Sequence, residues 1–413
     1  MIRTLAAVVM SFAAAIPAAD GVPAGLAHRH SPGGSLSGPV SYPAPPGVGF
    51  VVFMPEGLPP AFTTLVSRID GVRSAVLAAT ATLHITETRD SLGRIVDRPR
   101  PGYVIPVEGV GIDAAGYSAF VDDKTAGVLR SLRPGQVVLG ESSARIRRLG
   151  PGGRISFEGG FEATVAAVVG DEAVGFREVL MVASDLVAAA GAEETRFAFV
   201  RYRGDAVQLR TGLAALLEAG VAFRVRDLNG PGDRTRSVRP QVFIKEVFGE
   251  FAYRPTSRGR FRIDPDWTRD NIVFADIPLL GPTWCHRVYA ELLSAVMQRL
   301  ADDGLGSLID RSVFQGCWNP RYIAGSTRLS RHAWGVAADI NFGRRGDGPG
   351  SPVNPVLLRR MEAAGITSGY GWTIPDPGHF EFFGIDPWPA GLEASLLVDG
   401  FAFGFPEFGI AGS

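Results

Sequence analysis

The sequence has almost no net charge and few long hydrophobic runs. Its 413 residues carry 41 Lys and Arg against 42 Asp and Glu, so the formal net charge is −1. No overall charge therefore drives the chain toward nucleic acid or anionic lipid, and we expect no nucleic-acid partner. Beyond the N-terminus, no stretch approaches the ~18 consecutive apolar residues that a membrane-spanning helix needs. The length allows two or three globular domains.

The N-terminus is typical of an export signal. Arg3 precedes an apolar stretch of small residues at positions 5–16. We expect a signal peptide over residues 1–19, and an uncleaved N-terminal anchor is the alternative. No Cys lies nearby, which excludes a lipoprotein anchor. Residues 20–46 are rich in Ala, Gly, Pro and Ser, and this composition predicts a linker. The sequence thus predicts a secreted or cell-envelope protein.

Cysteine is scarce, since the chain contains only Cys285 and Cys317. An isolated pair in an exported protein predicts a disulfide. The alternative is that both thiols are metal ligands, but they lack the Cys-x-x-Cys spacing of such sites. A bridge would connect the start of a predicted helix to the loop that carries Arg321.

Histidine is scarce too, and two of the six His lie close to carboxylates near the C-terminus. His332 stands in the stretch SRHAWGVAAD, which ends at Asp339, and His379 stands in DPGHFE. Two imidazoles and one carboxylate form a set of three protein ligands with N, N and O donors. Such a set leaves a fourth tetrahedral position for water, as in catalytic rather than structural zinc sites.

The residues around these His predict two short strands. Positions 336–342 alternate between apolar and small or polar residues, which predicts a strand with one face in the core. Asp339 then projects from the polar face, and Gly335 lets the backbone bend between His332 and the strand. In the second stretch His379 and Glu381 share one face.

The two motifs resemble a known family. The pattern Ser-x-His-x-x-Gly-x-Ala-x-Asp, followed by Asp-x-x-His-Phe-Glu, resembles the zinc D-alanyl-D-alanine carboxypeptidases. This family also includes D-Ala-D-Ala dipeptidases and L-alanyl-D-glutamate endopeptidases. The resemblance runs from about Arg262 to Asp386. It implies an α+β zinc peptidase domain with a small antiparallel sheet (Hedgehog/DD-peptidase-like) that acts on peptidoglycan peptides.

Site roles follow from the resemblance, position by position. It implies that His332, Asp339 and His379 bind Zn²⁺. It implies that Asp376 is the general base, carried over the metal by the turn that precedes His379. It also implies that Arg321 binds the carbonyl or carboxylate of the substrate.

Some roles stay open at this point. Many relatives have Glu at the position of Asp376, so Glu381 is the alternative base; otherwise it orients a ligand His. Ser330 is expected either to contact substrate or to hydrogen-bond its own loop. His286 falls on a predicted helix and is expected to be structural.

Residues 47–228 predict a separate α+β module. Strand patterns at 48–54, 72–88, 196–202 and 221–228 alternate with helical patterns at 59–69 and 206–218, and a small β insertion is expected near 135–165. The stretch VVLGESSARIRRLGPGGRISF, followed by FEATVAAVVGD, resembles the extracytoplasmic core domain of ABC-type export permeases. This resemblance brings no catalytic residues, so it implies a binding or positioning module.

The remaining boundaries follow from composition. Residues 229–240 are polar and rich in turn formers, which predicts a second linker. The peptidase domain then covers 241–388, with helices predicted at 285–303 and after Asn354, and residues 389–413 form a C-terminal tail. Because all the candidate site residues lie beyond the second linker, we expect 241–413 to fold and act alone. The rival hypotheses are a non-catalytic zinc fold that binds cell wall and an accessory protein of an envelope transporter.

Overall fold

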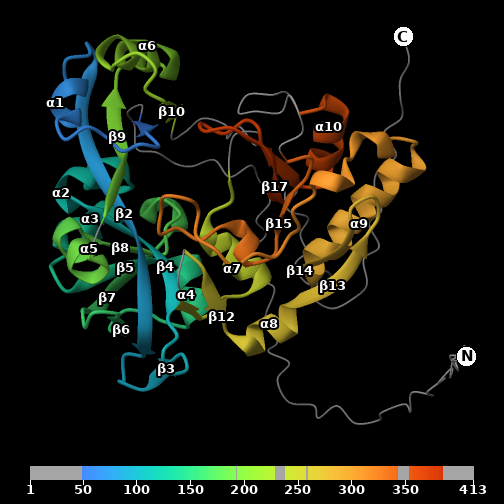
Figure 1. Ribbon diagram of the computed structural model, residues 1–413. Coiled ribbons are helices and arrows are strands. Elements are labelled where there is room, and N and C mark those ends of the chain that lie inside the picture. Colours follow the sequence, from blue (N-terminus) through green and yellow to red (C-terminus); the bar gives the residue numbers. More distant parts are fainter. Residues whose placement is uncertain (1–48, 192, 228–237, 257–258, 343–352, 385–413) are drawn as a thin grey trace, which may run out of the picture. The chain divides into compact units, whose positions relative to one another are not determined.

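The computed structural model describes residues 49–191, 193–227, 238–256, 259–342 and 353–384 (Figure 1). The predicted signal peptide, the first linker, the tail and most of the second linker lie outside these residues. The chain divides into two units, Met1–Ser37 and Gly38–Ser413, and all described residues belong to the second. Helices and strands are mixed throughout it, which confirms the predicted α+β class.

The first part of the described chain is built on one large mixed sheet. Its strands are β1 (Gly49–Phe53), β2 (Val72–Arg89), β3 (Ile95–Asp97), β4 (Ile105–Ile112), β5 (Gln136–Gly140), β6 (Arg154–Phe157), β7 (Glu162–Val169), β8 (Val179–Val182), β9 (Glu194–Tyr202) and β10 (Arg224–Asp227). They follow the order β10-β1-β9-β2-β4-β8-β5-β7-β6, with β3 on β2. Because β2 also pairs with β6, the six strands β2, β4, β8, β5, β7 and β6 close into a ring.

The predicted β insertion is not a separate unit. The strands β5, β6 and β7 lie where it was expected, but they hydrogen-bond to β8 and β2 and so belong to the main sheet. Composition could not reveal this, because backbone pairing between distant strands leaves little trace in the sequence. The long strand at 72–88 is confirmed as β2, which is rich in Val, Ala and Thr.

Short helices cover this sheet. They are α1 (Phe62–Val66), α2 (Ala114–Tyr117), α3 (Asp123–Ser131), α4 (Glu141–Arg147), α5 (Ala183–Ala190) and α6 (Ala206–Leu216). The predicted helix at 206–218 is confirmed as α6, where Asp205 and Gln208 form a reciprocal capping box. Leu209 and Leu213 of α6 belong to the same buried apolar cluster as Phe50 and Phe62.

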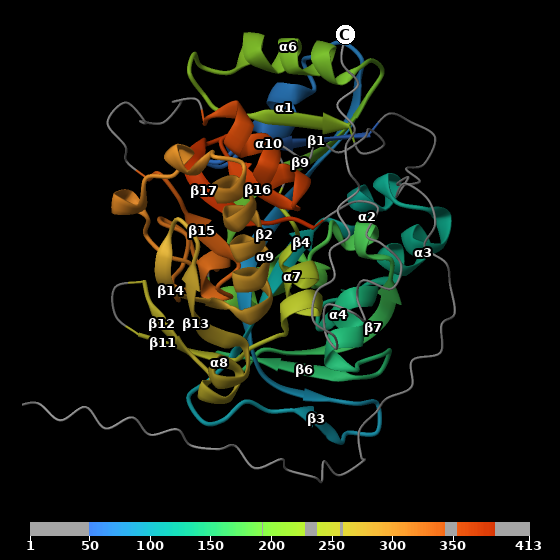
Figure 2. The same ribbon diagram turned by 90° about the vertical axis from the view of Figure 1, so that its right-hand side faces the viewer.

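The second part begins with α7 (Gln241–Phe248) and ends in a small sheet. Its other elements are β11 (Tyr253–Pro255), β12 (Phe261–Ile263), α8 (Pro265–Asn271), β13 (Ile272–Ile277), β14 (Gly281–His286), α9 (Arg287–Asp302), β15 (Ala337–Asp339), α10 (Pro355–Ala363), β16 (Ile366–Gly369) and β17 (Asp376–Phe382). The antiparallel order β15-β17-β16 confirms the predicted small sheet. This sheet lies beside α10 in both ribbon views (Figures 1 and 2).

Helix α10 is formed as its end signals predict. The side chain of Asn354 accepts hydrogen bonds from the N–H groups of Val356 and Leu357, and Pro355 occupies the first turn. Gly365 follows the helix with φ +76°, a conformation that favours glycine.

Two predicted boundaries are wrong. The helix expected at 285–303 begins at Arg287, because Cys285 and His286 pair with β13 and His286 caps the helix. The strand expected at 336–342 is only β15, because Asn341 adopts φ +57° and leaves the extended conformation. All three residues of β15 are buried, so the strand has no solvent-facing side.

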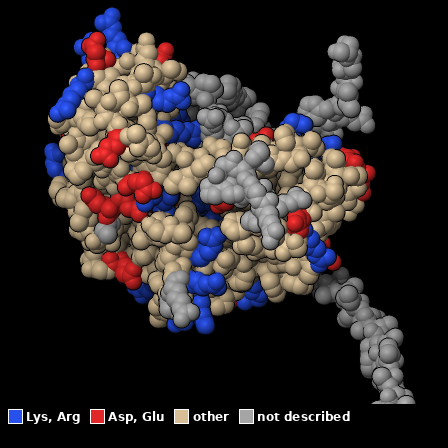
Figure 3. All heavy atoms as spheres, turned by 45° about the horizontal axis from the view of Figure 1, so that its top comes forward, with Lys and Arg blue, Asp and Glu red and all other residues tan. Residues whose placement is uncertain are grey.

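Helix length and surface charge agree with the composition. None of the helices in the described ranges is long and apolar enough to cross a membrane. Basic and acidic side chains both reach the face drawn in Figure 3, as the near-zero net charge leads one to expect.

Candidate metal centre

His332 is fixed by three groups of its own surroundings. It lies in the short 3₁₀ helix Arg331–Ala333, where Ser330 Oγ accepts a hydrogen bond from its N–H at 3.3 Å. Its Nδ1 lies 2.7 Å from the carbonyl oxygen of Cys317 and donates to it. The other nitrogen, Nε2, is therefore the one free to bind a metal, and it points to Asp339 Oδ1 at 3.1 Å.

His379 reaches the same carboxylate from β17. It stands directly opposite Asp339 in the pairing of β15 with β17. Its Nδ1 lies 3.1 Å from Asp339 Oδ1, and its Nε2 lies 3.1 Å from Glu381 Oε2. An ionised carboxylate only accepts hydrogen bonds, so without a metal both ring nitrogens are placed to donate. With Nε2 donating to Glu381, Nδ1 is the nitrogen that can bind a metal after losing its proton. Glu381 thus contacts a candidate ligand, as its predicted alternative role of orienting a ligand His requires.

These three side chains form the one metal-type cluster found among the described residues. One ligand atom from each of His332, Asp339 and His379 lies within 4.8 Å of the others, and all three residues are buried. The two free nitrogens and one carboxylate oxygen are the donors that catalytic zinc takes. Each imidazole also has a partner on its outer nitrogen, as metal-binding His usually does. The residues present therefore fit Zn²⁺.

The charges of the cluster are strongly coupled. Burial alone would raise the pKa of Asp339, but hydrogen bonds from His332 and His379 outweigh it and hold that pKa well below its usual range. Burial would likewise lower the pKa of His379, but its hydrogen bonds to Asp339 and Glu381 raise it to about 9. The pocket is thus arranged to keep one carboxylate ionised between cationic or metal-bound nitrogens.

The two predicted catalytic side chains lie next to this cluster. Asp376 is the first residue of β17, pairs with Gly369, and has its pKa raised by burial. The charges of His379, Asp339, His332 and Arg321 all act on it. Arg321 Nη2 lies 3.9 Å from Asp339 Oδ2, and about one third of the Arg321 side chain is exposed. Geometry therefore brings the five residues together, and their chemical roles stay predictions.

A disulfide holds the segment that hydrogen-bonds to the backbone of His332 and of Asp339. Cys285 and Cys317 are bonded, which confirms the predicted bridge. Gln315, inside the bridged loop, donates its N–H to the carbonyl of Asp339 at 3.0 Å, and Asn319, two residues after Cys317, donates its N–H to the carbonyl of His332 at 2.9 Å. The bridge therefore anchors the backbone that positions two candidate ligands.

Other predicted residues have structural partners. Ser330 is almost fully buried and its Oγ is engaged by His332, so its substrate contact stays a prediction. His286 caps α9 by accepting from Val288 N–H, and burial lowers its pKa to about 3, as expected of a structural His.

Two features of the site were not predicted from the sequence. The carbonyl of Cys317 orients His332, but a backbone group has no residue-type signal. The ring of Trp372 lies 5.2 Å from that of His379, and the short stretch GYGWT just upstream of the motif could have suggested it.

Comparison with known proteins gives matches to separate parts of the chain. No curated protein matches it. Among solved structures, the periplasmic region of MacB from Actinobacillus actinomycetemcomitans is 13% identical, covers 45% of this chain and 94% of its own, and has a TM-score of 0.29. The extracellular domain of the noncanonic ABC-type transporter YknZ from Gram-positive bacteria is 16% identical, covers 43% and 99%, and has a TM-score of 0.28. Residues 324–382, which hold His332, Asp339, Asp376 and His379, match the model of the D-alanyl-D-alanine carboxypeptidase family, so this part of the chain is similar to that peptidase family.

Proposed function

We propose that the protein is an extracytoplasmic zinc peptidase that hydrolyses the stem peptides of peptidoglycan. The bond cut would be the D-Ala-D-Ala bond, as in a carboxypeptidase, or the L-Ala-D-Glu bond, as in an endopeptidase. The observation that carries this proposal is the buried group of His332, Asp339 and His379 inside the segment that matches the peptidase family. The apolar N-terminal stretch and the disulfide support an oxidising, exported location.

The chain's own residues would divide the chemistry as follows. Zinc, when bound by the three ligands, supplies Lewis-acid activation of water and of the scissile carbonyl. Asp376 takes a proton from the attacking water and passes it to the nitrogen of the leaving amine as the C–N bond breaks. Burial of the Asp376 carboxyl favours this uptake and release of a proton, because it raises the pKa of Asp376 above its usual value.

Arg321 would bind the anionic end of the substrate or the developing oxyanion. It is a partly exposed cation that lies 3.9 Å from a ligand carboxylate, so it can reach a substrate held at the same centre. A planar guanidinium suits a carboxylate in particular, because it can donate two parallel hydrogen bonds.

Digestion of purified peptidoglycan tests the proposal. The full chain, loaded with zinc, should release products whose masses show loss of a terminal D-Ala or cleavage after L-Ala. The same protein stripped with a chelator should release nothing and should recover on zinc addition. The His332→Ala variant serves as the control for contaminating hydrolases.

The outcomes separate the hypotheses. Binding to peptidoglycan without any cleavage would favour the non-catalytic wall-binding alternative. Cleavage that persists after complete zinc removal would exclude the metallopeptidase.

A further inference from the structure

The segment that carries Arg321 is a small hairpin that starts and ends at the candidate centre. Tyr322 pairs with Leu329, and Ile323 N–H donates to the carbonyl of Arg328 at 2.8 Å. At its end, Ser330 N–H donates to the carbonyl of Arg321 at 3.1 Å. This Arg321 hairpin (residues 321–329) therefore has its base fixed directly before Ser330 and His332 in the chain.

A chain of hydrogen bonds joins the base of the hairpin to the large sheet. The hydroxyl of Tyr322 donates to that of Tyr253 at 3.1 Å, and the Tyr253 hydroxyl lies 2.7 Å from His84 Nε2. His84 Nδ1 lies 2.8 Å from Glu158 Oε2. Each group can donate to the next in one direction, which requires the proton of neutral His84 on Nδ1. Tyr253 is fully buried, so its hydroxyl needs such partners.

A second contact holds the tip of the hairpin. Thr82 Oγ1 donates to the carbonyl of Thr327 at 2.9 Å, and Thr82 is nearly buried. Thr82 and His84 are two apart on β2 and so share one face of the strand. The neighbouring Arg328 is partly buried, and desolvation lowers its pKa. One face of β2 therefore supports the Arg321 hairpin at both ends.

We propose that β2 positions Arg321, so that the first part of the chain completes the substrate-binding site of the second. The positioning residues are Thr82 and His84, the latter through Tyr253 and Tyr322. The ligand so oriented is the carboxylate end of a peptide, which the guanidinium of Arg321 would bind. This inference rests on the proposed peptidase function, and it gives the first part a role in affinity for substrate rather than only in location.

Isosteric variants of the full, zinc-loaded chain test the proposal. Thr82→Val and Tyr322→Phe each remove one hydroxyl, and loss of a neutral hydrogen bond should raise KM roughly 3- to 10-fold. Zinc content and kcat should stay within about twofold of wild type. Thr82→Ser, which keeps the hydroxyl, should have the KM of the wild type.

Matched controls exist elsewhere in the first part of the chain. Thr86 lies four residues beyond Thr82 on β2 and donates to the carbonyl of Ser156, so Thr86→Val makes the same change away from the hairpin. Tyr117 donates to the carbonyl of Ala173, so Tyr117→Phe matches Tyr322→Phe. Both controls should leave KM unchanged. Hydrogen exchange of residues 321–329 should be faster in Thr82→Val and unchanged in Thr86→Val.

A double variant shows whether Thr82 acts through Arg321. If it does, Thr82→Val should raise KM in the wild type but not in Arg321→Ala. Equal effects in both backgrounds, or unchanged hairpin exchange in Thr82→Val, would overturn the proposal. A wild-type protein that cleaves no wall peptide would instead overturn the proposed function itself, and the substrate role of the hairpin with it.

Discussion

The two imidazoles meet Asp339 through different ring nitrogens. His332 uses Nε2 because its Nδ1 donates to a backbone carbonyl, whereas His379 uses Nδ1 because its Nε2 faces Glu381. The partner on the outer nitrogen of each ring thus leaves one defined nitrogen to bind a metal. Such preorganisation favours one defined coordination geometry over a flexible one.

The purified protein is expected to hold about one zinc per chain, since the cluster offers one complete set of three ligands. His332→Ala should abolish stoichiometric zinc, because two remaining donors bind the ion weakly. His84→Ala is the control, because His84 lies in β2 with Glu158 and Tyr253 as partners. Metal analysis after dialysis measures both. Full zinc in His332→Ala would refute the ligand assignment.

The next prediction separates the base from its alternative. Asp376→Asn should retain zinc and lose turnover by about 10²-fold or more, because a general base supplies that order of acceleration. Glu381→Gln should keep measurable turnover but bind zinc about 10- to 100-fold more weakly, because Glu381 contacts a ligand His. Parallel zinc titrations and kinetics check this. The reverse pattern would make Glu381 the base.

Residue chemistry allowed the cluster to be predicted, but not its supports. His332, Asp339 and His379 were identified because two rare His stand near carboxylates at a recognisable spacing. The contacts of Tyr253 and Tyr322 join segments distant in the sequence, and no local pattern encodes them. Long-range hydrogen bonds depend on the folded topology, so sequence reasoning could not reach them.

At the scale of elements, one tight approach joins the first motif to β14. Gly335 has φ +70°, and a Cβ there would lie 2.6 Å from the backbone nitrogen of His286. The carbonyl of Gly335 accepts a hydrogen bond from that same nitrogen at 3.0 Å. The turn between the 3₁₀ helix and β15 therefore needs glycine for both conformation and space.

Gly335→Ala should accordingly destabilise the protein by more than about 1 kcal/mol and should weaken zinc binding, because His332 and Asp339 flank the turn. Gly127→Ala is a matched control, since Gly127 lies within α3 and a Cβ there would meet nothing within 4 Å. That control should stabilise by about 0.5–1 kcal/mol through helix propensity. Urea unfolding measures both changes. Equal stability of the two variants would contradict the role of Gly335.

The ends of elements show what local sequence can and cannot specify. Helix α10 was predicted because Asn354, Pro355 and Gly365 are local signals that act within one turn. The start of α9 was misplaced, because Cys285 and His286 form β-bridges with β13, which is a tertiary effect. Propensity is a weak prior wherever such pairing competes with it.

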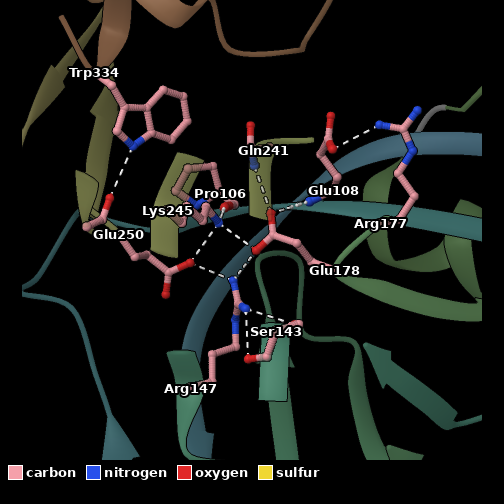
Figure 4. Close-up of polar contacts among 11 residues, drawn as sticks. Pro106, Glu108, Ser143, Arg147, Arg177, Glu178, Gln241, Lys245, Glu250 and Trp334 are labelled. Atoms are coloured by element: carbon pink, nitrogen blue, oxygen red, sulfur yellow. Dashed lines mark hydrogen bonds and ion pairs between the residues drawn. The ribbon is translucent and has the colours of Figure 1, made fainter. Parts of the chain in front are cut away.

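At the scale of the molecule, a buried ionic network joins the large sheet to α7 (Figure 4). Lys245 Nζ lies 2.7 Å from both Glu178 Oε2 and Glu250 Oε1, and Arg147 pairs with the same two carboxylates. Next to it, Trp334 of the metal motif donates to the carbonyl of Gly249 at 3.1 Å. Glu250 of the network directly follows Gly249 in the chain. The network is therefore adjacent to the contact between Gly249 and Trp334.

This network should make stability depend on acid. Burial alone would raise the pKa of Glu178, but Lys245 and Arg147 outweigh it and lower that pKa to about 2 from 4.5. The ionised carboxylate thus stabilises the fold above pH 4.5, and this contribution is lost as the pH falls toward 2. Glu178→Gln should cost about 3–5 kcal/mol at pH 7 and flatten the pH dependence. Glu141→Gln, at an exposed position, is the control. Denaturant unfolding at a series of pH values measures the free energy of unfolding of both variants, and the same pH dependence in both would refute the prediction.

The sequence alone led to the expectation that residues 241–413 fold and act without the rest, and the domain boundaries behind it stay a prediction. The contacts lead us to expect a different result. Val104 packs in the same core as α9 and exchanges backbone hydrogen bonds with Tyr253, and Lys245 contacts the carbonyl of Pro106 in β4 and the buried Glu178 just before β8. A 241–413 fragment loses all of these, together with the support of the Arg321 hairpin by β2. It should unfold at lower denaturant than the full chain, and any folded fraction should bind zinc but show a raised KM. A fragment with the midpoint and KM of the full chain would instead establish two independent domains.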